Sequence, residues 1–187
     1  MEVTQLKIIR IVFQDIQPRF DPTGQPPKCV LVLDMEDQKG LCTNDVPCIA
    51  EKLEKALPGI FPDENSPVDH SCGGRGSDVE KHSFREEIER GTNIPHLLEH
   101  VLIYLLSRRS NHCAAYCGQR SVDLEQGIDT HYYLVMECPS ELEAVVAIDL
   151  GFQIVSALIN GSTMVIDPVK VLDGIQRALE PMVNLAA

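Results

Sequence analysis

The residues of this chain with the clearest chemical potential are His96, Glu99 and His100, which form the pattern H-x-x-E-H. On an α-helix each residue advances by about 100°, so the three side chains share an arc of about 100°. Two imidazoles one turn apart can bind one Zn²⁺ ion, and a neighbouring carboxylate can take a proton from water bound to that ion. The pattern inverts the metalloprotease motif H-E-x-x-H. It therefore predicts a zinc site with His96 and His100 as ligands and Glu99 as general base.

A catalytic zinc ion usually has three protein ligands and one open position, so a third ligand must come from elsewhere in the chain. Glu137 is the first candidate, because it ends an apolar run at 132–136 where the pattern does not expect an acid. Glu141 and Glu143 are the alternatives, although the helix dipole and N-capping also explain acids in the first turn of a helix. The sequence leaves this choice open.

Other site chemistries have less support. The sequence contains neither G-x-x-x-x-G-K-[ST] nor a G-x-G-x-x-G pattern after a predicted strand, so no phosphate-binding loop is indicated. Seven widely spaced cysteines, an odd number, do not form the pattern of a disulfide framework. Cys113 and Cys117 lack the second ligand pair of a structural zinc site.

The helix that carries the motif is predicted from about Ile94 to Arg109, with Thr92 or Asn93 as its N-cap. Its apolar stripe is expected to face the core, with the motif on the opposite side. The predicted strands are Leu6–Phe13, Cys29–Met35 and His131–Cys138, with at most one short strand in the irregular stretch 113–129. The other predicted helices are Ile49–Leu57, Asp78–Arg90, about 140–159 and about 168–183.

Strands and helices do not alternate along the chain, which favours the α+β class over α/β. We therefore predict an antiparallel or mixed sheet packed against several helices, in a single domain over residues 1–187. A chain of 187 residues, 44% of them hydrophobic, can bury a substantial core without disulfides.

Charge and hydropathy indicate which classes of molecule this protein can bind. The net charge is −12, from 16 basic and 28 acidic residues, and the chain lacks the basic footprint of a nucleic-acid binder. No uninterrupted apolar run approaches the ~20 residues of a membrane span, and no signal peptide is visible, so we expect a cytoplasmic protein without a membrane partner. An acidic chain suits a cationic ligand such as an arginine-rich peptide. Whether the chain forms a homo-oligomer is left open.

Several motifs in a fixed order resemble one known family, the N-terminal domain of cyanophycin synthetase. Together they cover nearly the whole chain, from Leu6 to about Leu179. The chain departs from the family at 93–96, where Asn-Ile-Pro-His replaces the usual Trp-x-Gly-His after Gly-Thr. The motifs that carry the resemblance are Asn44-Asp45-Val46-Pro47, Leu57-Pro58-Gly59, His70-Ser71-Cys72, Arg90-Gly91-Thr92, His96–Val101 and Val135-Met136-Glu137.

The resemblance implies a substrate. Cyanophycin has a poly-aspartate backbone with arginine on the side-chain carboxylates. In the synthetases an ATP-grasp domain and a Mur-ligase-like domain follow this N-terminal domain, and we expect the present chain to act without them and not as the polymerase. For the N-terminal domain the resemblance implies polymer binding and, in some members, a metallopeptidase-like site on H-x-x-E-H that cuts the polymer. We therefore expect a zinc-dependent peptidase or amidohydrolase for arginine-rich acidic peptides, or else a non-catalytic module that binds cyanophycin or a separate synthetase chain.

Overall fold

The computed structural model describes residues 7–14, 28–35, 41–61, 83–107, 115–119, 131–138 and 140–162. In the C-terminal part it also describes Asp167, Lys170, Val171, Asp173, Gly174 and Arg177, of which all but Asp167 are helical. The rest of the predicted helix at 168–183 lies outside the described residues.

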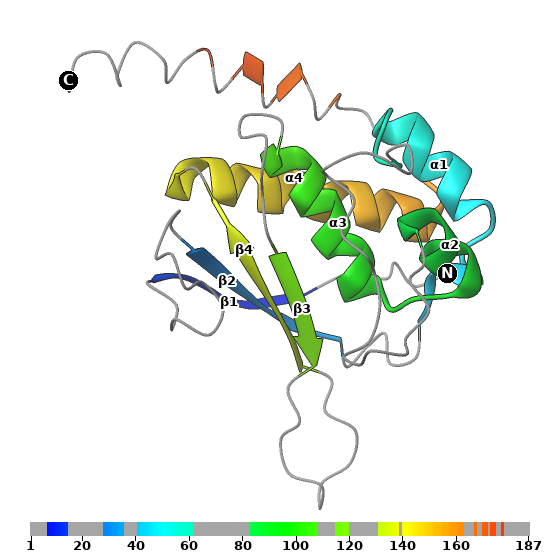
Figure 1. Cartoon of the computed structure of the whole chain (residues 1–187), viewed down its shortest axis with the longest axis horizontal. Helices are drawn as coiled ribbons and strands as arrows, with labels where there is room; N and C mark the ends of the chain where they lie inside the picture. Colours follow the sequence, from blue (N-terminus) through cyan, green and yellow to red (C-terminus); the bar gives the residue numbers. More distant parts are fainter. Residues whose placement is uncertain are drawn as a thin grey trace, which may run out of the picture.

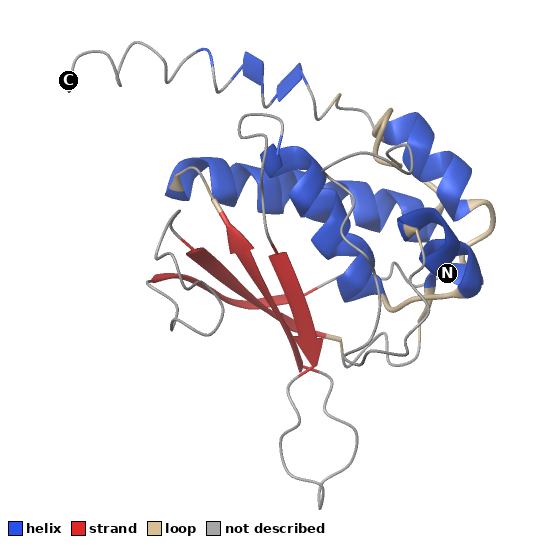
Figure 2. Ribbon diagram, viewed as in Figure 1, coloured by secondary structure: helices blue, strands red, loops and turns tan. Residues whose placement is uncertain are grey.

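A four-stranded antiparallel sheet forms one layer of the fold, in the order β1-β2-β4-β3 (Figure 2). The strands are β1 (Lys7–Gln14), β2 (Lys28–Asp34), β3 (Ala115–Gln119) and β4 (His131–Glu137). Three of these strands match the predicted ones within a residue or two, and β3 is the short strand that the irregular stretch allowed. The antiparallel sheet with helices confirms the predicted α+β class.

The helices are α1 (Ile49–Ala56), α2 (Phe84–Arg90), α3 (Ile94–Ser107) and α4 (Glu141–Asn160). A short 3-10 turn, η2 (Thr43–Asp45), precedes α1. Figure 1 shows α3 and α4 lying together over one face of the sheet, with α1 and α2 beyond them at the right of the view. The helix predicted at 78–90 begins only at Phe84, because Ser83 is extended and its hydroxyl caps the helix by accepting from the backbone N–H of Glu86. Residues 78–82 lie outside the described ones.

The core forms where α3 and α4 meet the sheet. Alternate residues of β2, namely Cys29, Leu31 and Leu33, are fully buried, as expected for a strand with one covered face. The two helices approach closely at Gly151, where a Cβ atom would lie 2.9 Å from the Leu102 side chain. A larger residue at position 151 would require the Leu102 side chain to shift.

Burial around α3 corrects one expectation. The motif face is predicted to lie opposite the core, but Glu99, His100 and Ile103 on that face are buried as well. The reason is tertiary, because Phe84 at the start of α2 stacks on His100 and covers part of this side of α3. A helix that is apolar or buried all round is typical of a core position.

Helix α4 has the length and hydropathy of a membrane span, although half of its most apolar stretch is buried inside the fold. Burial of this kind is what the core helix of a packed domain shows. Among the described residues no other helix meets both criteria.

Candidate metal centre

The start of α3 is fixed by the turn Gly91–Asn93. Gly91 ends α2 with φ of 106°, and a Cβ atom there would lie 2.6 Å from the Asn44 side chain. The Asn93 side chain accepts a hydrogen bond from the backbone N–H of His96 at 2.9 Å, which confirms Asn93 as the N-cap. The position of His96 on the helix is therefore set by both a turn and a cap.

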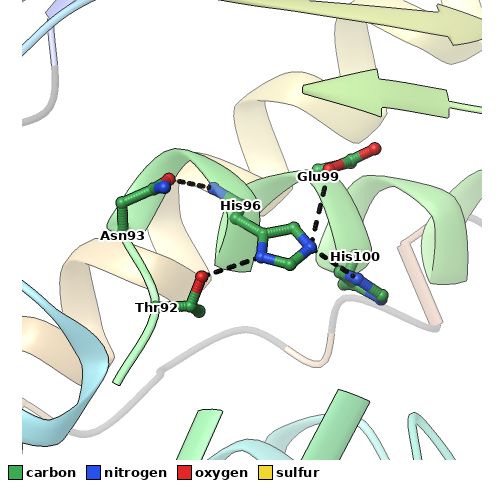
Figure 3. A network of polar contacts seen from close by, with 5 residues as sticks. All are labelled: Thr92, Asn93, His96, Glu99 and His100. Carbon is green, nitrogen blue, oxygen red and sulfur yellow. Dashed lines mark hydrogen bonds and ion pairs between the residues drawn. The ribbon is translucent and has the colours of Figure 1, made fainter. Parts of the chain in front are cut away.

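The two motif histidines face each other. Nε2 of His96 and Nε2 of His100 lie 3.2 Å apart (Figure 3). Two nitrogen ligands at 2.0–2.1 Å from one tetrahedral Zn²⁺ ion would be separated by about 3.3 Å. In donor type and in spacing, the pair fits two of the ligand positions of a zinc ion.

Two further side chains contact His96. The hydroxyl oxygen of Thr92 lies 2.8 Å from its Nδ1, on the side of the ring away from His100. A carboxylate oxygen of Glu99 lies 3.9 Å from its Nε2 (Figure 3). That distance exceeds direct hydrogen bonding and is one that a water molecule can bridge. Glu99 is 4% exposed, so its carboxylate acts on the histidines in a medium that screens charge weakly.

Aromatic side chains cover the other side of the pair. The ring of Phe84 stacks on His100 with centroids 3.6 Å apart and planes 5° apart. Phe61 packs against Phe84 at 5.4 Å, and the guanidinium of Arg85 lies over Phe61 at 4.4 Å. This arrangement holds the His100 ring in one orientation while His96 keeps partial exposure, 19% for its side chain.

Glu137 lies in a different environment from the histidines. Its carboxylate accepts a hydrogen bond from the Lys28 ammonium at 2.7 Å, in an ion pair whose side chains are 6% (Lys28) and 13% (Glu137) exposed. The two residues are register partners, at the start of β2 and the end of β4. Figure 1 shows that this end of β4 leads into the start of α4, whereas α3 begins beside α2.

The alternative ligands Glu141 and Glu143 also belong to the start of α4. Glu143 accepts a hydrogen bond from the Ser140 hydroxyl at 2.9 Å, and its backbone N–H donates to that hydroxyl. Ser140 is therefore the N-cap of α4. Among the described residues no group of three or more His, Cys, Asp or Glu side chains is placed to hold a metal ion. The structure thus brings together His96, His100 and Glu99, and the ligand role of Glu137 stays a prediction that the observed ion pair does not support.

Two residues of this centre were not predicted as parts of it. Thr92 was considered only as a helix cap, yet its spacing of four residues from His96 could have indicated a contact across one turn. Phe84 is seven residues before Gly91 on a separate helix, and nothing local in the sequence connects it to His100.

A facing histidine pair with an adjacent buried carboxylate, on a core helix over an antiparallel sheet, defines an α+β domain with a candidate metal centre. The sequence model of the Cyanophycin synthase-like N-terminal domain matches residues 30–160 of the 187. This span covers more than half of the chain and includes every residue of the centre, so the chain belongs to that family. A search of curated proteins finds no significant match.

Proposed function

We propose that this protein is a zinc-dependent peptidase or amidohydrolase that cuts cyanophycin-like, arginine-rich acidic peptides. The observation that carries the proposal is the 3.2 Å separation of the two Nε2 atoms, each on a ring held from its other side. His96 and His100 would hold the ion. A bound Zn²⁺ ion lowers the pKa of coordinated water towards ~7 and so supplies a nucleophile at neutral pH.

Glu99 is the proposed general base. Its carboxylate takes a proton from the attacking water as the water oxygen adds to the amide carbonyl carbon. The same carboxylic acid then returns the proton to the leaving nitrogen as the C–N bond breaks, so the base is regenerated. The position of the Glu99 carboxylate supports this role, because its oxygen lies 3.9 Å from Nε2 of His96, a distance that a water molecule can bridge.

The proposed substrate class follows from the family and from charge. A chain with net charge −12 attracts a polymer whose arginine side chains are cationic. This long-range attraction weakens with salt, so binding of the polymer should weaken as ionic strength rises. We propose a cytoplasmic location, and no nucleic-acid or membrane partner.

A second candidate function, a non-catalytic module that binds cyanophycin or a synthetase chain, is favoured by a specific observation. The described residues supply two protein ligands and not the three that catalytic zinc sites have. A two-histidine site without a third ligand would bind zinc weakly and would leave the domain with polymer binding alone.

One experiment separates the two candidates. The full chain, purified without a metal-affinity tag, is incubated with arginine-bearing poly-aspartate in the presence of zinc and, in parallel, with a chelator. Release of new amino termini that depends on zinc supports the hydrolase. Binding of the polymer without cleavage under both conditions supports the module.

A further inference from the structure

The hydroxyl of Thr92 contacts the one ring nitrogen of His96 that does not face His100. The distance from Oγ1 to Nδ1 is 2.8 Å, and both residues lie on the same side of the first turn of α3. Because a neutral imidazole carries one proton, the partner of Nδ1 decides which nitrogen is protonated. Metal-bound histidines commonly donate the N–H of the other ring nitrogen to an oxygen acceptor.

Thr92 is itself held in place by Thr43 of η2. The backbone N–H of Thr43 donates to the carbonyl of Thr92 at 2.8 Å, and the backbone N–H of Thr92 donates to the hydroxyl of Thr43 at 2.9 Å. That hydroxyl donates in turn to the carbonyl of Ile88, near the end of α2, at 2.7 Å. Thr43 is fully buried, so this connection is shielded from water.

We propose that Thr92 is a positioning residue for the metal centre. Its hydroxyl accepts a hydrogen bond from Nδ1–H of His96 and thereby leaves the Nε2 lone pair directed at His100. In the other tautomer of His96 the proton is on Nε2, which then has no lone pair to bind a metal ion. This inference rests on the proposed function where it concerns zinc, and on the hydrogen bond alone where it concerns the tautomer.

In the metal-free chain the 3.2 Å contact between the rings is then a hydrogen bond, which Nε2–H of His100 donates to Nε2 of His96. The two histidines therefore have opposite tautomers before zinc is added: His96 is protonated on Nδ1 and His100 on Nε2. A long-range ¹H–¹⁵N correlation spectrum of the imidazoles distinguishes these forms directly, with no measurement of activity.

The test uses the ¹⁵N-labelled full chain, zinc-free and at a pH of about 8, where imidazoles are neutral. We expect His96 to be protonated on Nδ1. Thr92→Val, which keeps the side-chain shape and loses the hydroxyl, should populate the Nε2–H form of His96 and weaken zinc binding roughly 10- to 100-fold. Thr92→Ser keeps the hydroxyl and should restore both the tautomer and zinc affinity.

The control variant is Ser140→Ala, which removes a hydroxyl from the cap of α4. It should lower stability without changing the His96 tautomer or the zinc affinity. Protonation of His96 on Nε2 in the wild-type chain would overturn the inference, and so would a Thr92→Val variant that keeps both the tautomer and the zinc affinity. If the wild-type chain has the expected tautomer but binds no zinc, the proposed function fails while the assignment of the Thr92 hydrogen bond stands.

Discussion

Nε2 of His96 and Nε2 of His100 point at each other across 3.2 Å, one helical turn apart on α3. Each ring is held from its other side, His96 by the Thr92 hydroxyl and His100 by the stacked ring of Phe84. Holding two imidazole rings in facing positions costs conformational entropy. Pre-arranged ligands of this kind reduce the ordering that metal binding would otherwise require.

The two histidines should differ in their effect on stability. His100 is 8% exposed and stacks on Phe84, so His100→Ala leaves a cavity in the contact between α2 and α3. We expect a loss of roughly 2–4 kcal/mol in the free energy of unfolding, against a smaller loss for the more exposed His96→Ala. Urea denaturation of the metal-free variants measures both values, and equal losses would contradict this account of the packing.

Glu99→Gln separates binding from catalysis. Glutamine keeps the size of the side chain and a hydrogen-bond acceptor, but it cannot take a proton at neutral pH. We expect zinc affinity to change little and the rate of polymer cleavage to fall by ~10²–10⁴. Bound zinc and released amino termini are measured on the same preparation, and a variant that cuts as fast as wild type would remove Glu99 as the base.

Glu137→Ala should act on stability and not on zinc. The substitution removes one member of a buried ion pair, which typically costs about 3–5 kcal/mol. The double variant Lys28→Met/Glu137→Leu should recover most of that loss, because an apolar pair of similar size needs no ionic partner. Glu141→Ala, at an exposed position, is the matched control. If zinc affinity falls in Glu137→Ala and not in the control, Glu137 is a ligand after all.

If the centre is catalytic, a third protein ligand is expected from a part of the chain other than β4 or α4. The segment between Phe61 and Ser83 contains His70, Cys72 and His82. Its two ends adjoin the centre, since Phe61 packs on Phe84, the residue after Ser83, and Phe84 stacks on His100. Substituting these three residues one at a time by alanine should reduce zinc affinity in one variant far more than in the other two. Equal affinities in all three would exclude these three residues as the third ligand.

Stability should fall in alkaline solution because two thiols are buried. Burial, and secondarily the neighbouring Cys138, raises the pKa of Cys29 from 9.0 to about 12. Burial, and secondarily Glu141, raises the pKa of Cys138 to about 11. Above about pH 9 the unfolded chain loses these protons while the folded chain keeps them, so the free energy of unfolding decreases as pH rises towards the folded values.

The measurement is urea denaturation on either side of pH 9 for wild type, Cys29→Ala and Cys48→Ala. Cys48 is exposed and provides the control. The loss of stability with rising pH should be smaller in Cys29→Ala than in wild type, and should be unchanged in Cys48→Ala. An identical pH dependence in all three proteins would show that the buried thiol is not responsible.

Most helices and strands and the facing histidine pair could be predicted from the sequence. The side chains that surround the pair could not. Helical spacing alone places His96 and His100 one turn apart, and the cap at Asn93 is a local signal. The stacking of Phe84 and the hydrogen bonds of Thr43 depend on how α2 and η2 pack against α3, which no local pattern encodes. For the same reason the motif face was expected to lie away from the core.

The partner of Glu137 could not be predicted from the local sequence either. An acid at the end of an apolar strand is unusual in sequence, and the pattern correctly marks it as a special residue. Its partner is 109 positions away in the chain, at Lys28, and becomes a neighbour only through the pairing of β2 with β4. Ion pairing and metal ligation both require a carboxylate at such a position, so residue type alone could not choose between them.

The most direct test of the central claim, that His96 and His100 share one metal ion, is a zinc titration of the full chain purified without a metal-affinity tag. The titration monitors heat of binding in wild type, His96→Ala, His100→Ala and the packing control Phe84→Leu. We expect about one Zn²⁺ per wild-type chain, binding lost in both histidine variants, and binding weakened but retained in Phe84→Leu. A wild-type chain that binds no zinc, or a histidine variant that still binds one ion with wild-type affinity, would contradict it.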